Sequence, residues 1–324
     1  MRRVRGITAF VSFVSLLVLH ASVSWAQPTP TWEQLQAAYA YDHALPLDPV
    51  AEEPIDLGAF TAQTVRFQSV NEQTVPCTVC KPKNVERPPV ILSLHGLGGS
   101  RQDVLRVAAP LLCPLGVAIV GIDAQLHGDR KVEGRKILSS GVDSTTAAFS
   151  QTIIDNMRAV DYIQSREDLD GERVVLLGVS MGGIMGSIVA ALDPRIKAAC
   201  LVVAGGDLVT MFARTAIGDA DEMRAAIGDI GQFRASLAII EPLNFVGHIS
   251  PRPLYMVNGR TDQIVPPECG EALFAAAGEP KSIVWYESDN MMGHIPPLDV
   301  LLKQVTEFLK SQNLMPEPAA AAGN

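Results

Sequence analysis

The stretch at residues 173–183, which reads Arg-Val-Val-Leu-Leu-Gly-Val-Ser-Met-Gly-Gly, limits the fold more than any other part of the chain. Its first half is an unbroken apolar run of strand length, which is typical of a strand buried on both faces. Glycines then surround Ser180, and residues 184–192 read as an apolar helix. A strand, a tight turn and a helix with a serine at the apex form a nucleophile elbow. The pattern therefore predicts Ser180 as a catalytic nucleophile rather than as part of a plain glycine-rich turn.

Apolar runs and amphipathic segments alternate along most of the chain. This alternation predicts an α/β fold with a mostly parallel central sheet and helices on both faces. Residues 64–69 and 74–81 read as two antiparallel strands that come first. The pattern then predicts buried strands at residues 90–95, 117–123, 198–204, 253–258 and 282–287, and helices at residues 31–45, 101–112, 147–166 and 298–311.

Two segments interrupt this alternation. Residues 125–146 are polar, and we expect them to form a surface excursion. Residues 207–244 have a helical pattern, with Met223, Ile227 and Ile230 along one side. This second segment follows a predicted strand, at the sheet edge where α/β folds bind ligands. We expect it to be either a small helical cap insertion over the site or a connecting pair of surface helices.

Residues 1–26 have the three-part plan of a secretory signal peptide. A basic start precedes an apolar run at residues 7–25, and Ser24-Trp25-Ala26 resembles a cleavage site. The alternative is an uncleaved membrane anchor, but serines and His20 weaken the run as a bilayer span. We therefore expect cleavage after Ala26, a secreted or periplasmic protein, and no stable membrane insertion after cleavage.

The rest of the chain is long enough for one large domain. Residues 27–60 are expected as an N-terminal extension, residues 61–312 as the α/β domain, and the alanine-rich residues 313–324 as a disordered tail. Hydrophobic residues make up 48% of the sequence, which is enough to fill a large core. The formal net charge of −9 argues against nucleic acid as a partner, because an acidic surface repels phosphates.

The sequence contains five cysteines, so at least one is unpaired in a monomer. Cys77 and Cys80 lie in a predicted strand, where residues three apart point to opposite faces, and this opposes a local disulfide. The chain offers no second cysteine pair and no nearby histidine that would complete a metal site with them. The sequence therefore predicts no metal site at these cysteines.

Two residues that follow later strands can complete a catalytic triad with Ser180. Asp262 follows the predicted strand at residues 253–258, although an aspartate there can also cap the turn. His294 follows the last predicted strand in a glycine-containing loop, and none of the other five histidines does so. Because the carboxyl ends of parallel strands meet at one sheet edge, we expect Asp262 as the acid and His294 as the base of the triad.

A glycine-rich loop, His95-Gly-Leu-Gly-Gly, follows the predicted strand at residues 90–95. Its glycines allow backbone amides to turn inward, as an oxyanion hole requires. We expect one donor to be the amide of Leu97 and the other to be the amide of Met181, directly after the nucleophile. The alternative is a plain glycine turn.

Together these motifs resemble the α/β-hydrolase superfamily, in particular its dienelactone hydrolase, acetyl xylan esterase and prolyl oligopeptidase-like branch. The resemblance implies the α/β-hydrolase fold and the chain order nucleophile, acid, base. The serine at position 180 departs from the cysteine of dienelactone hydrolases, and the chain has no room for the β-propeller of prolyl oligopeptidases. The matching residues are 95–99, 161–170, 178–183, 258–262 and 293–294.

The expected function is that of a serine carboxylesterase that cleaves small-molecule esters through an acyl-enzyme, without a metal or organic cofactor. An acyl-peptide or small-peptide hydrolase would use the same site, and a non-catalytic binding protein is a remote alternative. Met211, Phe212 and Met292 are candidate substrate contacts, although apolar residues more often belong to the core. The sequence leaves the acyl group, the alcohol and the oligomeric state open.

Overall fold

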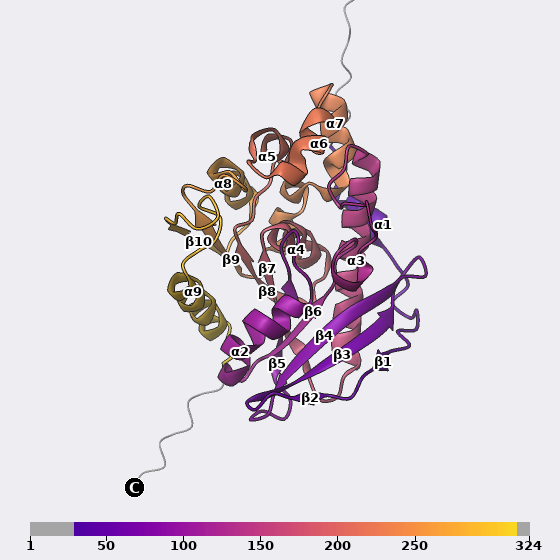
Figure 1. Ribbon diagram of the computed structural model, residues 1–324, viewed down its shortest axis with the longest axis vertical. Helices are drawn as coiled ribbons and strands as arrows, with labels where there is room; N and C mark the ends of the chain where they lie inside the picture. The colour runs from indigo at the N-terminus through magenta and orange to yellow at the C-terminus, as the bar shows by residue number, and fades with distance from the viewer. Residues whose placement is uncertain (1–28, 316–324) are drawn as a thin grey trace, which may run out of the picture.

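The computed structural model describes residues 29–315, and a ten-stranded sheet forms its centre (Figure 1). The strand order is β1-β3-β4-β6-β5-β7-β8-β9-β10, and β2 also pairs with β3. Strands β5 to β10 run parallel to one another, whereas β1 to β4 join the sheet by antiparallel pairing. The strands are β1 (Val50–Ala51), β2 (Ile55–Asp56), β3 (Phe60–Gln68), β4 (Thr74–Pro82), β5 (Pro89–Leu94), β6 (Ala118–Ile122), β7 (Asp170–Val179), β8 (Ile196–Val202), β9 (Leu254–Gly259) and β10 (Lys281–Tyr286).

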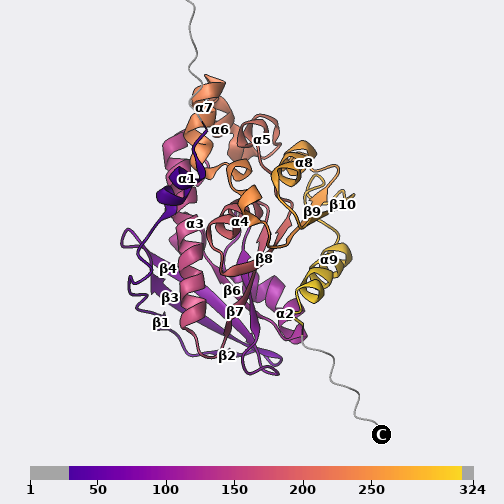
Figure 2. The ribbon, with the colours of Figure 1, turned by 180° about the vertical axis from the view of Figure 1, so that it is seen from behind.

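Helices cover both faces of this sheet. Figure 2 shows α3 running along one face, and Figure 1 shows α2 and α9 against the other. The predicted α/β-hydrolase architecture, a mostly parallel sheet with helices on both faces, is confirmed. The helices are α1 (Trp32–Tyr39), α2 (Ala109–Leu112), α3 (Val142–Ser165), α4 (Met181–Leu192), α5 (Leu208–Arg214), α6 (Asp221–Ala225), α7 (Ile230–Leu237), α8 (Pro267–Ala276) and α9 (Leu298–Ser311).

The strand β7 is buried on both faces, as its unbroken apolar run predicts. Val174 and Leu176 belong to the core on the α3 side, whereas Val175 and Leu177 belong to the core on the α9 side. The alternation follows from the two-residue period of a strand. Burial on both sides holds the carboxyl end of β7 rigidly, and this end carries Ser180.

Several expected elements have the bounds that the sequence predicts. The closing helix α9 occupies the predicted residues 298–311, and β3 and β4 form the predicted antiparallel pair. The predicted helix at residues 101–112 is helical from residue 102, and it contains a π-helical stretch at Val104–Ala108 that leads into α2. A π-helical turn inside a helical segment has no clear signal in the sequence pattern.

The expectation of a polar surface excursion at residues 125–146 is wrong in its second half. Ile137 and Leu138 are buried in the core, and α3 already begins at Val142. Two apolar residues among charged neighbours have no helical or strand period, so the pattern does not reveal their burial.

The N-terminal residues contact the same core as the later elements. Leu35 and Tyr39 of α1 are buried in it, and the Tyr39 hydroxyl donates a hydrogen bond of 2.6 Å to the carbonyl of Ile239. The expected signal peptide and most of the expected tail lie outside the described residues. Among the residues that are described, no helix is long and apolar enough to cross a bilayer.

All five cysteines are buried and carry free thiols. Cys77 and Cys80 lie three apart in β4 and belong to the cores on opposite faces of the sheet. This arrangement is the one that the strand period predicts, and it separates the two side chains.

Residues 207–244 form a helical insertion that contains α5, α6 and α7. Its start is fixed by the buried carboxylate of Glu241, which accepts hydrogen bonds from the amides of Asp207, Leu208 and Leu243. Burial raises the pKa of Glu241, and these three backbone hydrogen bonds oppose that rise. The insertion gathers at one end of the molecule (Figure 1), and α7 packs against α3.

Candidate active site

Ser180 lies at the apex of the turn between β7 and α4. Its backbone has φ 55° and ψ −122°, a conformation that a non-glycine residue adopts only under strain. The Ser180 amide donates a hydrogen bond of 2.8 Å to the carbonyl of Val202 on the neighbouring strand β8. This hydrogen bond to the sheet keeps the Ser180 backbone in its strained conformation. The structure therefore has the nucleophile elbow that the sequence predicts.

Glycine is required at position 182 because the turn is tight. A side-chain carbon at Gly182 would lie 2.1 Å from the carbonyl oxygen of Leu94. This close approach brings the start of α4 against the end of β5, and so brings Ser180 against the loop that follows β5.

Ser180, His294 and Asp262 form one hydrogen-bonded chain. The His294 Nε2 atom lies 2.9 Å from the Ser180 Oγ atom, and the His294 Nδ1 atom lies 2.7 Å from the Asp262 Oδ2 atom. Both Asp262 and His294 are buried. They follow β9 and β10, whose carboxyl ends meet that of β7 at the same sheet edge.

Backbone and side-chain contacts hold the acid in place. The second carboxylate oxygen of Asp262, Oδ1, accepts hydrogen bonds of 2.8 Å from the Ile264 amide and 3.0 Å from the Val265 amide. These donors fix the carboxylate so that Oδ2 faces His294. The turn-capping role of Asp262 and its contact with His294 therefore occur together.

The loop that carries His294 is also held tightly. Gly293 has φ 82°, and a side-chain carbon there would lie 2.4 Å from the Thr261 carbonyl oxygen, so only glycine fits. The Tyr286 hydroxyl donates a hydrogen bond of 2.6 Å to the carbonyl of His294. Tyr286 has no motif of its own, and its only sequence signal is its place at the end of a predicted strand.

The loop after β5 passes directly beside the serine. A side-chain carbon at Gly96 would lie 3.4 Å from the Ser180 Cβ atom. Leu97 and Met181 both line the cavity at Ser180. Within residues 29–315, the amides of Leu97 and Met181 donate no hydrogen bond to another part of the chain. Two unpaired amides on either side of the serine are the arrangement that an oxyanion hole needs.

His95 anchors this loop, a role that the sequence analysis missed. Its Nδ1 atom lies 2.8 Å from the Gly96 carbonyl, and its Nε2 atom accepts a hydrogen bond of 3.1 Å from the Ala124 amide. The ring is therefore neutral, with its proton on Nδ1. Burial lowers the pKa of His95, although the Gly96 carbonyl opposes this change. His127 lies beside it, with ring centroids 5.2 Å apart.

A small apolar cavity opens at the serine and has a volume of about 60 Å³. The insertion supplies much of its wall, as a cap would. Met211 and Phe212 line this cavity, in agreement with their predicted position. The complete lining is Leu97, Leu138, Phe149, Ser180, Met181, Ile184, Leu208, Met211, Phe212, Thr215, Ile217, Ala220, Ile264 and Val265.

Met292 is not among the residues that line this cavity, and its contact with substrate stays a prediction. Its backbone has φ 56°, and its carbonyl accepts a hydrogen bond from the Gln263 amide. This turn directs the side chain toward solvent, and 43% of the residue is exposed.

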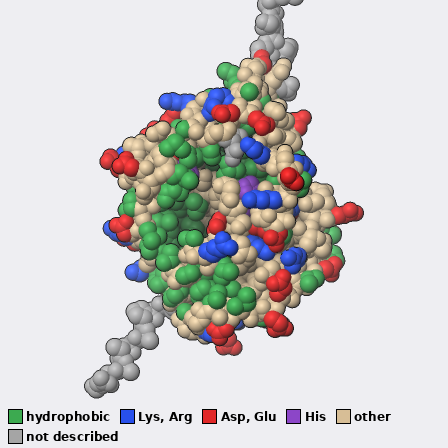
Figure 3. Space-filling view, viewed as in Figure 1, with side chains coloured by type: hydrophobic (Ala, Val, Ile, Leu, Met, Phe, Trp, Pro, Cys, Tyr) green, Lys and Arg blue, Asp and Glu red, His purple; other side chains and the backbone are tan. Residues whose placement is uncertain are grey.

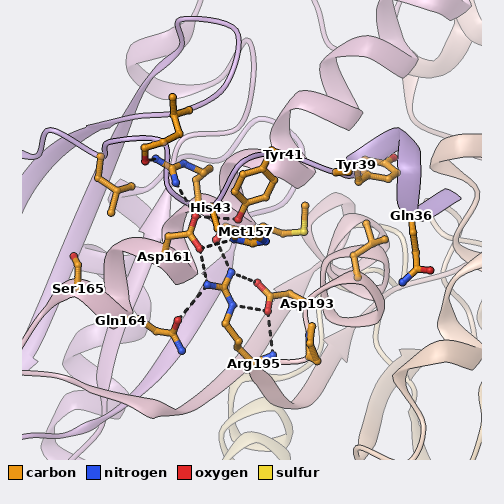
Figure 4. Close-up of a pocket in the computed structure, with 16 residues that line it drawn as sticks. Gln36, Tyr39, Tyr41, His43, Met157, Asp161, Gln164, Ser165, Asp193 and Arg195 are labelled. Carbon is orange, nitrogen blue, oxygen red and sulfur yellow. Dashed lines mark hydrogen bonds and ion pairs between the residues drawn. The ribbon is translucent and has the colours of Figure 1, made fainter. Parts of the chain in front are cut away.

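A larger cavity lies elsewhere, between the N-terminal segment and the end of α4, and has a volume of about 750 Å³ (Figure 4). Its centre is Asp161, which accepts hydrogen bonds from Tyr41, Arg158 and Arg195. Arg195 also binds Asp193. These charges neutralise one another, and the cavity holds none of the triad residues.

The described part of the chain contains no cluster of three or more histidine, cysteine, aspartate or glutamate side chains that could hold a metal ion. The hydrogen-bonded contacts at Ser180 bring together a hydroxyl, an imidazole and a carboxylate.

Residues 33–309 match the family model of the acetyl xylan esterases (AXE1). A putative hydrolase, YtaP of Bacillus subtilis, is 31% identical over 149 residues, which are 42% of this chain and 50% of that protein. The acetyl esterase Axe7A of Xylanibacter ruminicola is 24% identical over 237 residues, which are 69% of this chain and 54% of that protein. The chain thus spans about half the length of these curated relatives.

Solved structures show the same fold. The acetyl xylan esterase from Paenibacillus sp. R4 superimposes with a TM-score of 0.71 at 21% identity, over 86% of this chain and 92% of that one. Acetyl xylan esterase 1 from Thermoanaerobacterium sp. superimposes with a TM-score of 0.69 at 18% identity, over 86% of this chain and 95% of that one.

Proposed function

The chain belongs to the acetyl xylan esterase family, and from this premise we propose that it is a serine carboxylesterase that hydrolyses carboxylic esters through an acyl-enzyme. The observation that carries the proposal is the hydrogen-bonded chain from Ser180 through His294 to Asp262. These hydrogen bonds lead to Ser180, which lies on a strained turn. Beside it are the amides of Leu97 and Met181, which have no hydrogen-bond partner among the described residues. The same features support the assignment of a catalytic role to each of the three side chains.

In the acylation step the Ser180 Oγ atom attacks the ester carbonyl, and His294 Nε2 takes the hydroxyl proton. Asp262 keeps the proton on Nδ1 and stabilises the imidazolium that forms. The amides of Leu97 and Met181 stabilise the negative charge on the tetrahedral oxygen. His294 then gives its proton to the leaving alcohol, and the acyl group stays on Ser180.

In the deacylation step a water molecule takes the place of the alcohol. His294 Nε2 removes a proton from this water, which attacks the acyl carbonyl and releases the acid from Ser180. The nucleophile, the base and the oxyanion donors all come from the chain, so the mechanism needs no metal or organic cofactor.

The acyl group that fits best is short. The cavity beside Ser180 has a volume of about 60 Å³, well below the roughly 300 Å³ at which ordinary small-molecule sites begin. Its wall is mostly apolar and includes Phe149, Met211 and Phe212. An acetyl group satisfies both limits, whereas a long acyl chain requires these side chains to move.

The test is hydrolysis of p-nitrophenyl acetate, butyrate and octanoate, together with an N-acetyl peptide amide. We expect kcat/KM to fall steadily as the acyl chain grows beyond acetate, because each added methylene must displace part of the cavity wall. Turnover of the peptide amide but not of the esters would contradict the proposal and favour a peptide hydrolase. No turnover of any of these substrates would favour a binding protein.

We also propose that residues 1–26 direct export and are removed after Ala26. The basic start, the apolar run and the small residues at 24 and 26 support this. Mass spectrometry of the protein from an exporting host should find Gln27 as the N-terminal residue. An intact N-terminus in the membrane fraction would instead indicate an anchor.

A further inference from the structure

A second cavity lies beside the acyl cavity and has a volume of about 390 Å³. Leu97 and Leu138 line both cavities, so the two meet at the loop expected to hold the oxyanion. The wall of the second cavity comes mainly from residues 126–138. Its lining is Leu97, Gly98, Leu126, His127, Lys131, Val132, Glu133, Arg135, Lys136, Ile137 and Leu138.

This second cavity is positively charged on an acidic protein. Lys131, Arg135 and Lys136 line it against one carboxylate, Glu133. The formal net charge of the whole sequence is −9. The excess of positive side chains at this cavity is therefore opposite in sign to the net charge of the protein. Figure 3 shows a hollow with hydrophobic side chains on one side and lysine and arginine side chains on the other.

Two of these cations have no carboxylate partner in the part of the chain that the structure describes. None of its ion pairs includes Lys131 or Arg135, and both residues are exposed. The arginines in the larger cavity differ, because Arg158 and Arg195 there are each paired with Asp161. A cation that faces a cavity without a partner remains available to an anionic ligand.

The two cavities can receive different parts of one ester, the acyl group in the smaller cavity and the alcohol in the larger one. The acyl cavity is small and apolar and has room for a short acyl group. The alcohol part of the same ester must leave in another direction, and the larger cavity adjoins the oxyanion loop. Its volume lies in the range that small-molecule sites have.

We propose that this cavity binds the alcohol part of the substrate and that the preferred alcohol carries a carboxylate, which Lys131 and Arg135 attract. The inference rests on the proposed esterase function and adds a substrate class to it. The exposed cations guide an anionic ester to Ser180 and hold it there, and they contribute little to a neutral ester.

The test compares two acetyl esters of matched shape, 4-acetoxybenzoate, which is an anion, and its neutral methyl ester. For each enzyme variant the ratio of kcat/KM for the anion to kcat/KM for the neutral ester is measured. Comparing this ratio between variants cancels the different intrinsic reactivity of the two esters. In the wild type the ratio should fall as ionic strength rises, because salt screens exposed charges.

The double variant Lys131→Ala/Arg135→Ala should lower this ratio by about tenfold, because it removes the two positive charges that attract the anionic ester. The charge-preserving variant Lys131→Arg/Arg135→Lys should keep the ratio. Lys197→Ala removes an exposed lysine at the start of β8 and serves as the control, with the ratio unchanged.

An equal ratio in the wild type and the double alanine variant would overturn the inference while leaving the esterase function intact. A wild-type enzyme that hydrolyses neither ester would overturn the esterase function itself. A ratio that falls equally in Lys197→Ala would also contradict the inference, because the effect would then come from the net charge and not from this cavity.

Discussion

The cavity around Asp161 and the cavity beside Ser180 differ in volume, in whether their polar groups have partners, and in backbone strain. The first has a volume of about 750 Å³, and the second about 60 Å³. At Asp161 the carboxylate is surrounded by Tyr41, Arg158 and Arg195, and the opposite charges pair with each other (Figure 4). At Ser180 the backbone is strained, and the amides of Leu97 and Met181 have no hydrogen-bond partner among residues 29–315.

This difference teaches that volume alone does not identify the reactive site. In a network whose charges are already paired, the groups have no capacity left for a reacting atom, and removing one partner leaves a buried charge uncompensated. A strained nucleophile with unpaired donors nearby is costly to the fold and is maintained where it serves chemistry. The two regions should therefore respond to substitution in opposite ways.

The largest expected effect is that of Ser180→Ala, which should lower kcat for p-nitrophenyl acetate by about 10⁴-fold or more while the protein stays folded. The variant removes the nucleophile and relieves strain at the elbow. Ser187→Ala is the matched control, because Ser187 is a buried serine of α4 whose hydroxyl binds only the Ile184 carbonyl. Activity near the wild-type level in Ser180→Ala would contradict the role of this serine.

The opposite response is expected for Asp161→Ala. Removing this carboxylate leaves the buried guanidinium of Arg158 without its charge partner and should lower the free energy of unfolding by about 3 kcal/mol. The kcat should change by less than about threefold, because none of the triad residues lines the cavity around Asp161. Urea unfolding and esterase assays measure both quantities.

Glu167→Gln is the control for this second experiment, since Glu167 is an exposed carboxylate close to Asp161 in sequence. It should leave stability unchanged within about 0.5 kcal/mol. A loss of kcat in Asp161→Ala much larger than threefold would contradict the prediction that the Asp161 cavity affects stability and not catalysis.

A third prediction concerns the size of the acyl cavity. Phe212→Ala removes part of its wall and should raise the butyrate-to-acetate ratio of kcat/KM by about tenfold, because the added methylenes then find room. Phe274→Ala serves as the control, since Phe274 of α8 does not line the cavity. An unchanged ratio in Phe212→Ala would show that this cavity does not receive the acyl group.

The smallest expected effect is a dependence of stability on pH at the oxyanion loop. Burial lowers the pKa of His95 below its ordinary value of 6.5, so the unfolded chain binds more protons than the folded one just below that pH. The free energy of unfolding should therefore fall as pH falls below 6.5, by at most about 1.4 kcal/mol per pH unit for this group.

His95→Asn should flatten this dependence, although His127 contributes in the same direction because burial also lowers its pKa. Urea unfolding between pH 5 and 7.5 measures the slope. A slope as steep in His95→Asn as in the wild type would contradict the assignment of a neutral, buried imidazole at this loop.

The parts of the fold that the sequence predicted well share one property, which is a strong local period. Strand β7 has an unbroken apolar run, and α9 has a clear amphipathic pattern, so both were expected at nearly their observed bounds. The order Ser180, Asp262, His294 followed from the rule that parallel strands end at one edge. These features depend on neighbours in sequence or on topology.

The parts that were missed depend on contacts between distant segments. His95 is held by Ala124, and the carboxylate of Glu241 holds the start of α5; neither pair has a spacing that a pattern could detect. The outward direction of Met292 follows from a left-handed backbone angle in its turn. The periodicity of apolar residues predicts neither long-range hydrogen bonds nor individual backbone angles.

The central claim is that Ser180 is the nucleophile that the triad activates. A fluorophosphonate probe tests it directly, because such probes react with activated serines and not with ordinary hydroxyl groups. Peptide mass spectrometry should locate one adduct per chain, on Ser180, and esterase activity should fall in proportion to labelling. An adduct on another residue, or full activity in a protein fully labelled at Ser180, would contradict the account.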